Sequence, residues 1–285
     1  ETWEYTYPGY LGDNGNMWNT DSSTLMDPVI ISDGQKLYLL ADLFPAGYSI
    51  SNTSTTHVCS DPGPAFDAEG RLLLSDDGRQ TYGYCLQNGR VCTIGGEKTG
   101  YDVRGWFDLS DQDGVYISNL FFGDSPYLPR GTSFICMTTS SDGGGTWSDP
   151  VLLDLKDPET PWLILGPGSG LVTQEGKLAF TAYDGEHIYL VYGDDTGWEK
   201  VMSGAASNES SIVELKNGTI RAFVKGGGRN TIAYVDFRKT ADGYVAGELM
   251  DTGNGNFSNC MVSSLRCSRT CKGREVILVC CPSDS

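Results

Sequence analysis

Residues 140–147, with the sequence Ser-Ser-Asp-Gly-Gly-Gly-Thr-Trp, constrain the fold more than any other part of the chain. Apolar residues alternate over 132–139, which predicts a strand, and residues 150–155 are typical of a second strand. The segment between them therefore predicts a hairpin turn. In such a turn the Asp142 carboxylate accepts backbone N–H groups and the glycines adopt positive φ. We expect Trp147 to cover the turn and to be largely buried, so this segment is a structural element and not a catalyst.

Short apolar runs separated by glycine-containing turns dominate the 285-residue chain, which has 37 glycines. Hydrophobic residues make up 39% and aromatic residues 11% of the chain, values typical of a folded globular protein. Because no long stretch has helical periodicity, this pattern predicts an all-β protein.

The formal net charge of −17 excludes one class of partner. Nucleic acid and anionic membrane surfaces repel such a chain, and no cluster of Lys or Arg offsets the charge. The sequence also lacks an apolar run of about 18 residues, so we expect no membrane span. Because it begins Glu1-Thr2-Trp3, the chain looks trimmed at its start.

The chain has nine cysteines, and the sequence leaves their disulfide state open. Cys85 and Cys92 flank a short glycine-containing segment and could form a hairpin disulfide. Cys267 and Cys271, followed by residues 280–281, invite a zinc site, but no His lies near and the spacing is wrong. We therefore expect no metal.

Short strands recur regularly from residue 132 onward. They are predicted at 132–140, 150–155, 169–174, 177–183, 187–193, 210–215, 219–225, 231–237, 259–267 and 275–281, with an earlier one at 36–43. Such spacing is typical of the meandering four-stranded blades of a β-propeller. A shortened version of the first turn is predicted at 193–198, and residues 236–238 stand where a third would fall. Residues from about 45 to 130 are too many for a plain loop, so they predict an inserted β-rich subdomain.

Four parts of the sequence resemble bacterial sialidases of the exo-acting, retaining kind, especially the branch with a β insertion in the propeller. They are residues 140–147, which fit the S-x-D-x-G-x-T-W pattern of the sialidase Asp box; residues 25–28 with 39–47; the Gly-Pro-Gly-Ser-Gly segment 166–170; and residues 208–215 with 217–218. The specified positions of the Asp box are Ser140, Asp142, Gly144, Thr146 and Trp147. The resemblance implies a six-bladed β-propeller. Residues 1–285 would be a central portion of the catalytic domain, holding about four blades.

The resemblance also implies a reaction. Sialic acid carries a carboxylate on its anomeric carbon, which would repel a carboxylate nucleophile, and family members use a tyrosine activated by a glutamate instead. Arginines clamp the substrate carboxylate, and an aspartate supplies the proton for the leaving oxygen. This chemistry requires no metal or other cofactor. Glu209 matches the catalytic glutamate.

Several residues match substrate-binding positions of the family. Met26 and Asp27 match pocket residues, and Tyr183 matches a pocket tyrosine. Lys225 stands where the family has its second arginine; it keeps the positive charge but loses the bidentate guanidinium fork, and Arg229 is the alternative. We expect the matched residues to converge with the catalytic glutamate on the propeller axis.

The resemblance predicts an exo-α-sialidase, a retaining glycoside hydrolase that releases terminal sialic acid from glycoconjugates. An intramolecular trans-sialidase is a close variant. A catalytically inactive propeller that binds sialylated glycans is the alternative, and Lys225 favours it. Two of the family's arginines, its acid aspartate and its tyrosine nucleophile find no match here, so we expect residues 1–285 alone to be inactive.

The resemblance further implies a location and partners. It implies a bacterial protein outside the cell or on the cell surface, with sialylated glycans or glycoproteins as partners. Carbohydrate-binding modules would lie elsewhere in the full-length chain.

Overall fold

The computed structural model describes residues 23–46, 48, 63–76, 81–156, 160, 163–204, 209–224, 231–255 and 261–282. These residues form β-strands and one 3₁₀ turn, Gly105–Phe107, and contain no α-helix. By its internal contacts the chain divides into two compact units. Unit 1 comprises residues 1–26, 42–138 and 148–162, and unit 2 comprises residues 27–41, 139–147 and 163–285.

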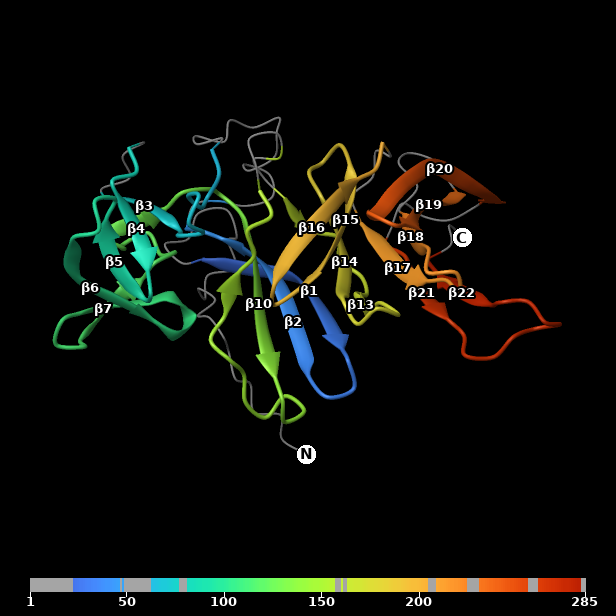
Figure 1. The fold of residues 1–285 in the computed structure, drawn as a ribbon, viewed down its shortest axis with the longest axis horizontal. Coiled ribbons are helices and arrows are strands. Elements are labelled where there is room, and N and C mark those ends of the chain that lie inside the picture. The colour runs from blue at the N-terminus through green and yellow to red at the C-terminus, as the bar shows by residue number, and fades with distance from the viewer. Residues whose placement is uncertain are drawn as a thin grey trace. The chain divides into compact units, whose positions relative to one another are not determined.

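The first four-stranded sheet has the order β1-β2-β10-β11 (Figure 1). Its strands are β1 (Thr24–Ser32), β2 (Leu37–Phe44), β10 (Phe134–Ser140) and β11 (Val151–Leu152). β1 is absent from the sequence prediction because Asp27-Pro28 reads as a turn. The long segment between β2 and β10 forms a separate sheet.

That separate sheet has seven strands in the order β8-β7-β6-β5-β4-β3-β9. They are β3 (Leu73–Asp76), β4 (Tyr84–Gln87), β5 (Arg90–Thr93), β6 (Lys98–Arg104), β7 (Asp108–Asp111), β8 (Tyr116–Asn119) and β9 (Tyr127–Pro129). The β4–β5 hairpin turns at Asn88-Gly89, both with positive φ, which is the geometry of a tight primed turn. Cys85 and Cys92 lie opposite each other in this hairpin, and both are thiols.

The remaining sheets lie in unit 2 and follow the chain in order (Figure 1). The first contains β12 (Ile164–Leu165), β13 (Leu171–Val172), β14 (Leu178–Tyr183), β15 (Ile188–Asp194) and β16 (Gly197–Met202). The second contains β17 (Ser210–Glu214), β18 (Ile220–Val224), β19 (Thr231–Thr240) and β20 (Gly243–Gly255). The third is the antiparallel pair β21 (Ser263–Arg266) and β22 (Ile277–Cys280). Consecutive strands pair antiparallel within the second and third sheets, as in the meandering blades of a propeller.

The core of unit 2 joins the β12–β16 sheet to the β17–β20 sheet. A cluster of buried apolar side chains draws from both sheets and includes Ile188, Leu190, Tyr192, Ile212, Ile220 and Phe237. Full burial of one such side chain contributes about 1.5–3 kcal/mol before the entropic cost of ordering it. This apolar contact holds the two sheets face to face.

The turn at residues 140–147 has the hydrogen bonds that its sequence predicts. Asp142 Oδ1 accepts the Thr146 N–H at 2.8 Å and the Ser140 hydroxyl at 2.8 Å, and Asp142 Oδ2 accepts the Thr146 hydroxyl at 2.7 Å. These bonds, led by the Thr146 N–H, lower the pKa of Asp142 to about 2. Gly143 and Gly144 have positive φ. Trp147 lies near Gly144 and is partly buried.

A turn of the same kind recurs in the β15–β16 hairpin but not in β19. In the β15–β16 hairpin, Asp194 Oδ1 accepts the Thr196 N–H at 2.8 Å, as in a shortened version of the first turn. Residues 236–238, where a third such turn would fall, lie inside β19, in agreement with the strand predicted at 231–237. Asp236 binds Arg221 on the neighbouring strand with both carboxylate oxygens, at 2.7 and 2.8 Å.

Candidate active site

Asp27 lies in a perturbed environment. It lies in β1 with φ of 52°, a left-handed conformation that costs a non-glycine residue about 1–3 kcal/mol. Burial and the charge of Glu209 both raise the pKa of its carboxyl above the ordinary value. A carboxylate that keeps its proton more readily and sits on a strained backbone is typical of a functional site.

Glu209 is half-buried and directly precedes β17. Its charge acts on Asp27, so the structure brings together these two residues, which are far apart in the sequence. Both belong to unit 2.

The Gly-Pro-Gly-Ser-Gly segment fits closely against the start of β17. A Cβ on Gly166 would lie 2.7 Å from Thr181 Oγ1 and 3.0 Å from Ser210 Oγ. A Cβ on Gly168 would lie 2.4 Å from the Ser210 carbonyl oxygen. Any side chain at these positions would push the segment away from the strand that follows Glu209. The glycines therefore serve close packing here.

Tyr183 is the last residue of β14, pairs with Ile164 in the sheet and is only 5% exposed. The turn that follows it is organised by Asp184, which accepts the N–H groups of Glu186 and His187 at 2.9 and 2.7 Å. The Tyr189 hydroxyl donates to the other Asp184 oxygen at 2.7 Å. Burial opposes ionisation of Asp184, but these hydrogen bonds outweigh it and lower its pKa.

Met26 and Lys225 are the two other predicted substrate-binding residues. Met26 precedes Asp27 in β1 and is half-buried. Lys225, together with its alternative Arg229, lies outside the described residues. The convergence of Met26, Tyr183 and Lys225 with Glu209 therefore stays a prediction.

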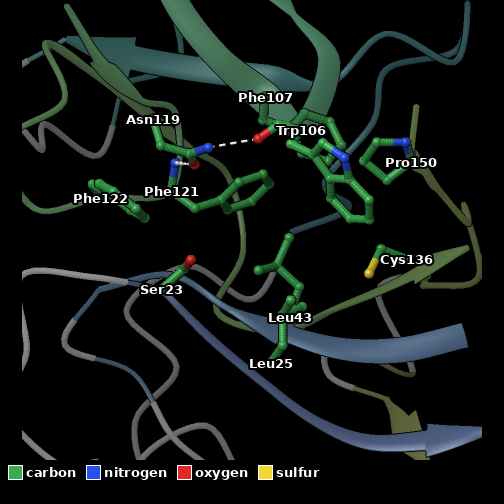
Figure 2. Close-up of a pocket in the computed structure, with 10 residues that line it drawn as sticks. All are labelled: Ser23, Leu25, Leu43, Trp106, Phe107, Asn119, Phe121, Phe122, Cys136 and Pro150. Carbon is green, nitrogen blue, oxygen red and sulfur yellow. Dashed lines mark hydrogen bonds between the residues drawn. The ribbon is translucent and has the colours of Figure 1, made fainter. Parts of the chain in front are cut away.

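Unit 1 contains a hollow that sequence reasoning missed (Figure 2). It is shallow, with a volume of about 20 Å³, and is lined by Ser23, Leu25, Leu43, Trp106, Phe107, Asn119, Phe121, Phe122, Cys136 and Pro150. Trp106 and Phe107 both have positive φ, at 58° and 63°. The Asn119 amide holds this backbone by donating to the Trp106 carbonyl at 2.5 Å and accepting the Phe121 N–H at 3.0 Å.

The described residues lack two further features. No group of three or more His, Cys, Asp or Glu side chains is placed to hold a metal ion there. No helix in the same residues is long and apolar enough to cross a membrane.

Comparisons with curated proteins place relatives over most of the chain, although no protein-family model matches it. The chain is 27% identical to the anhydrosialidase of Macrobdella decora over 259 residues, which cover 75% of this chain and 33% of the relative. It is 28% identical to Sialidase B of Streptococcus pneumoniae over 244 residues, which cover 72% of this chain and 34% of the relative. The chain thus spans about a third of the length of these two proteins.

Solved structures agree with the sequence relatives. The intramolecular trans-sialidase from Ruminococcus gnavus, in complex with oseltamivir carboxylate, superposes with a TM-score of 0.77 at 25% identity, over 92% of this chain and 61% of that one. A leech intramolecular trans-sialidase complexed with 2,7-anhydro-Neu5Ac superposes with a TM-score of 0.76 at 25% identity, over 91% of this chain and 44% of that one.

The predicted fold class, an all-β propeller of the sialidase type, is confirmed by these superpositions and by the meandering sheets of the described residues. Sequence relatives and structural neighbours point to the same proteins. The chain is therefore similar in sequence and in fold to sialidases, among them Sialidase B and the anhydrosialidase.

Proposed function

We propose that this chain is part of an exo-α-sialidase, a retaining glycoside hydrolase that releases terminal sialic acid from glycoconjugates. The observation that carries the proposal is the proximity of Asp27 and Glu209. Each occupies a position matched to the sialidase pocket, and the fold brings their charges together across the sequence. The inactive, glycan-binding alternative has no such observation in its favour, because Lys225 lies outside the described residues.

The proposed roles follow from the chemistry of each side chain. Glu209 would polarise the hydroxyl of the tyrosine nucleophile, and Asp27 would contact a ring hydroxyl or the amino-group region of the sugar. Lys225 would bind the substrate carboxylate as a point charge, and Met26 and Tyr183 would line the pocket. No tyrosine of this chain is assigned as nucleophile, and no cofactor is needed.

The scaffold around these residues is part of the proposal. The turn at 140–147 would be the Asp box, with Ser140, Asp142, Gly144, Thr146 and Trp147 at its specified positions. The seven-stranded sheet β3–β9 would be a subdomain inserted at about residues 45–130, between β2 and β10 of one blade.

A finer version of the function rests on the names of the relatives. One is an anhydrosialidase and two are intramolecular trans-sialidases, so an anhydro sugar is the alternative product to free sialic acid. We propose sialylated glycans or glycoproteins as partners, further carbohydrate-binding modules in the whole protein, and a place outside a bacterial cell or on its surface.

Incubating the whole protein that contains this chain with 3′-sialyllactose tests the function. Proton NMR distinguishes free sialic acid from its 2,7-anhydro derivative. We expect Glu209→Gln to lower kcat at least 100-fold, since the nucleophile would lose its activating base. The exposed Glu186→Gln is the matched control. Binding of the sialoside without release of either product would replace the hydrolase proposal with the binding alternative.

A further inference from the structure

The first two residues of β17 are serines whose side chains are fully buried, and each bonds to a different neighbour. The Ser210 hydroxyl donates to Thr181 Oγ1 on β14 at 2.7 Å. Ser211 Oγ lies 3.1 Å from Ser169 Oγ and 2.9 Å from Ser264 Oγ, and it accepts the Ser264 N–H at 3.0 Å. Side-chain hydroxyls thus tie the start of β17 to both adjacent sheets.

Such hydroxyl pairs specify geometry more than they add stability. A buried hydroxyl loses its bonds to water, so a hydrogen-bonded pair contributes little more than two well-packed apolar groups of the same shape. It does fix the relative position of the two atoms within a few tenths of an ångström. The hydroxyls that lie among the apolar contacts of these sheets therefore fix the position of β17 relative to its neighbours.

The residues that these hydroxyls hold are members of the candidate site. Ser210 directly follows Glu209, and Thr181 lies two residues before Tyr183 on β14. Gly166 lets both hydroxyls meet, because a Cβ there would be within 3.0 Å of each. The Ser210–Thr181 bond consequently links the strand of the predicted pocket tyrosine to the predicted catalytic glutamate.

We propose that Ser210 and Thr181 form a positioning clamp for Glu209, with Ser211 as its second anchor. The clamp rests on the proposed function for its catalytic meaning, but not for its geometry. It would keep the Glu209 carboxylate at a fixed distance from Asp27 and from the substrate, where a displacement of about 1 Å can cost 100-fold in rate.

The test uses four variants. Ser210→Ala and Thr181→Val remove the hydrogen bond from either side, and Thr181→Ser restores a hydroxyl at the same place. Thr99→Val is the matched control, because the Thr99 hydroxyl also makes a 2.7 Å hydrogen bond, to the Val91 carbonyl in the seven-stranded sheet.

The first readout needs no enzymatic activity. Carbon-13 NMR follows the titration of the Asp27 carboxyl, whose pKa responds to the distance of the Glu209 charge. We expect Ser210→Ala and Thr181→Val to move the Asp27 pKa toward its ordinary value by similar amounts, and the double variant to do no more than either. Thr181→Ser and Thr99→Val should leave it in place. An Asp27 pKa that is unchanged in Ser210→Ala, with the fold intact, overturns the clamp.

The second readout is sialoside cleavage by the whole protein. We expect roughly a tenfold loss of kcat with little change in KM for Ser210→Ala and Thr181→Val, and recovery in Thr181→Ser. Should the whole protein cleave no sialoside at all, the proposed function fails, while the Asp27 titration still decides the clamp.

Discussion

At the residue scale, two carboxylates that share a half-buried environment control the candidate site. Burial and Glu209 raise the pKa of Asp27, so the folded protein holds this proton more tightly than the unfolded chain does. The free energy of unfolding must then fall as pH rises from the ordinary Asp value through the raised one. The site therefore costs stability near neutral pH, as strained and like-charged groups in functional sites generally do.

Glu209→Gln should lower the pKa of Asp27, because it removes a negative charge and leaves burial unchanged. The fall in stability over the same pH window should shrink correspondingly. Carbon-13 NMR titration of Asp27 and urea unfolding between pH 3 and pH 7 measure the two effects. Glu186→Gln, on the exposed turn after β14, should change neither. A pKa of Asp27 that ignores Glu209→Gln would separate the two residues and remove the basis for the site.

The contribution of Asp142 to stability depends on pH in the opposite direction to that of Asp27. Its pKa lies at about 2 because the Thr146 N–H, the Thr146 hydroxyl and the Ser140 hydroxyl all favour the carboxylate. Its contribution to stability is therefore complete above the ordinary value of 3.8 and is lost as pH falls toward 2. Asp142→Asn should lower stability at pH 7 and flatten its decline between pH 4 and pH 2, as measured by thermal unfolding. The same change at the exposed Asp195 should give wild-type curves.

At the element scale, alternation of apolar residues predicted the inner strands well. β14, β15, β17 and β18 fall within about a residue of their predicted ranges, because each has one or both faces buried. β16 and β20 were missed, since they are outer strands of their sheets with mixed polar and glycine-containing sequences. β19 begins where it was predicted and runs three residues further, and Asp236 forms an ion pair with Arg221 inside it.

The candidate site also has some features that the sequence predicted and others that only the structure shows. Sequence resemblance supplied Asp27, Glu209 and the Gly-Pro-Gly-Ser-Gly segment, while the close packing of that segment against Ser210 is seen only in the structure. The contact of Ser210 with Thr181 had no sequence signal, because a hydrogen bond between side chains on two sheets depends on how the sheets pack. Spacing within one strand carries no information about that.

The Gly-Pro-Gly segment leads to a prediction about close approach. Gly168→Ala would place a Cβ 2.4 Å from the Ser210 carbonyl oxygen, so the segment or β17 must shift. We expect a loss of about 1–3 kcal/mol in the free energy of unfolding, the usual cost of overpacking. Gly204→Ala is the control, because nothing lies within 4 Å of its Cβ, and it should stay within about 0.5 kcal/mol. Urea unfolding compares the two; equal values would mean that residues 166–170 do not pack tightly on β17.

At the scale of the whole molecule, the net charge of −17 opposes association of the chain with other anions. Part of this charge is structural, since Asp33, Asp67, Asp111, Asp142, Asp184 and Asp194 all accept backbone N–H groups in turns. A sialoside is also an anion, so its binding must depend on local cations and donors rather than on the overall field. The same negative charge makes copies of the chain repel one another.

The β21–β22 pair exposes apolar side chains whose attraction for another copy of the chain would oppose the charge repulsion. Leu265 and Leu278 lie opposite each other and are 63% and 56% exposed, while Ile277 and Val279 pack into the core cluster beneath. Charge repulsion reaches about 30 Å at 0.01 M salt but only about 8 Å at 0.15 M. We therefore expect residues 1–285 to be monomeric at low salt and to self-associate as salt is raised, because screening leaves the apolar attraction unopposed.

Replacing Leu265 with Lys and Leu278 with Glu keeps the net charge and should keep the chain monomeric in sedimentation velocity at both salt concentrations. Ile30→Lys, at a single residue that is 58% exposed, should still associate. Salt-dependent association that survives the double substitution would place the contact on another face.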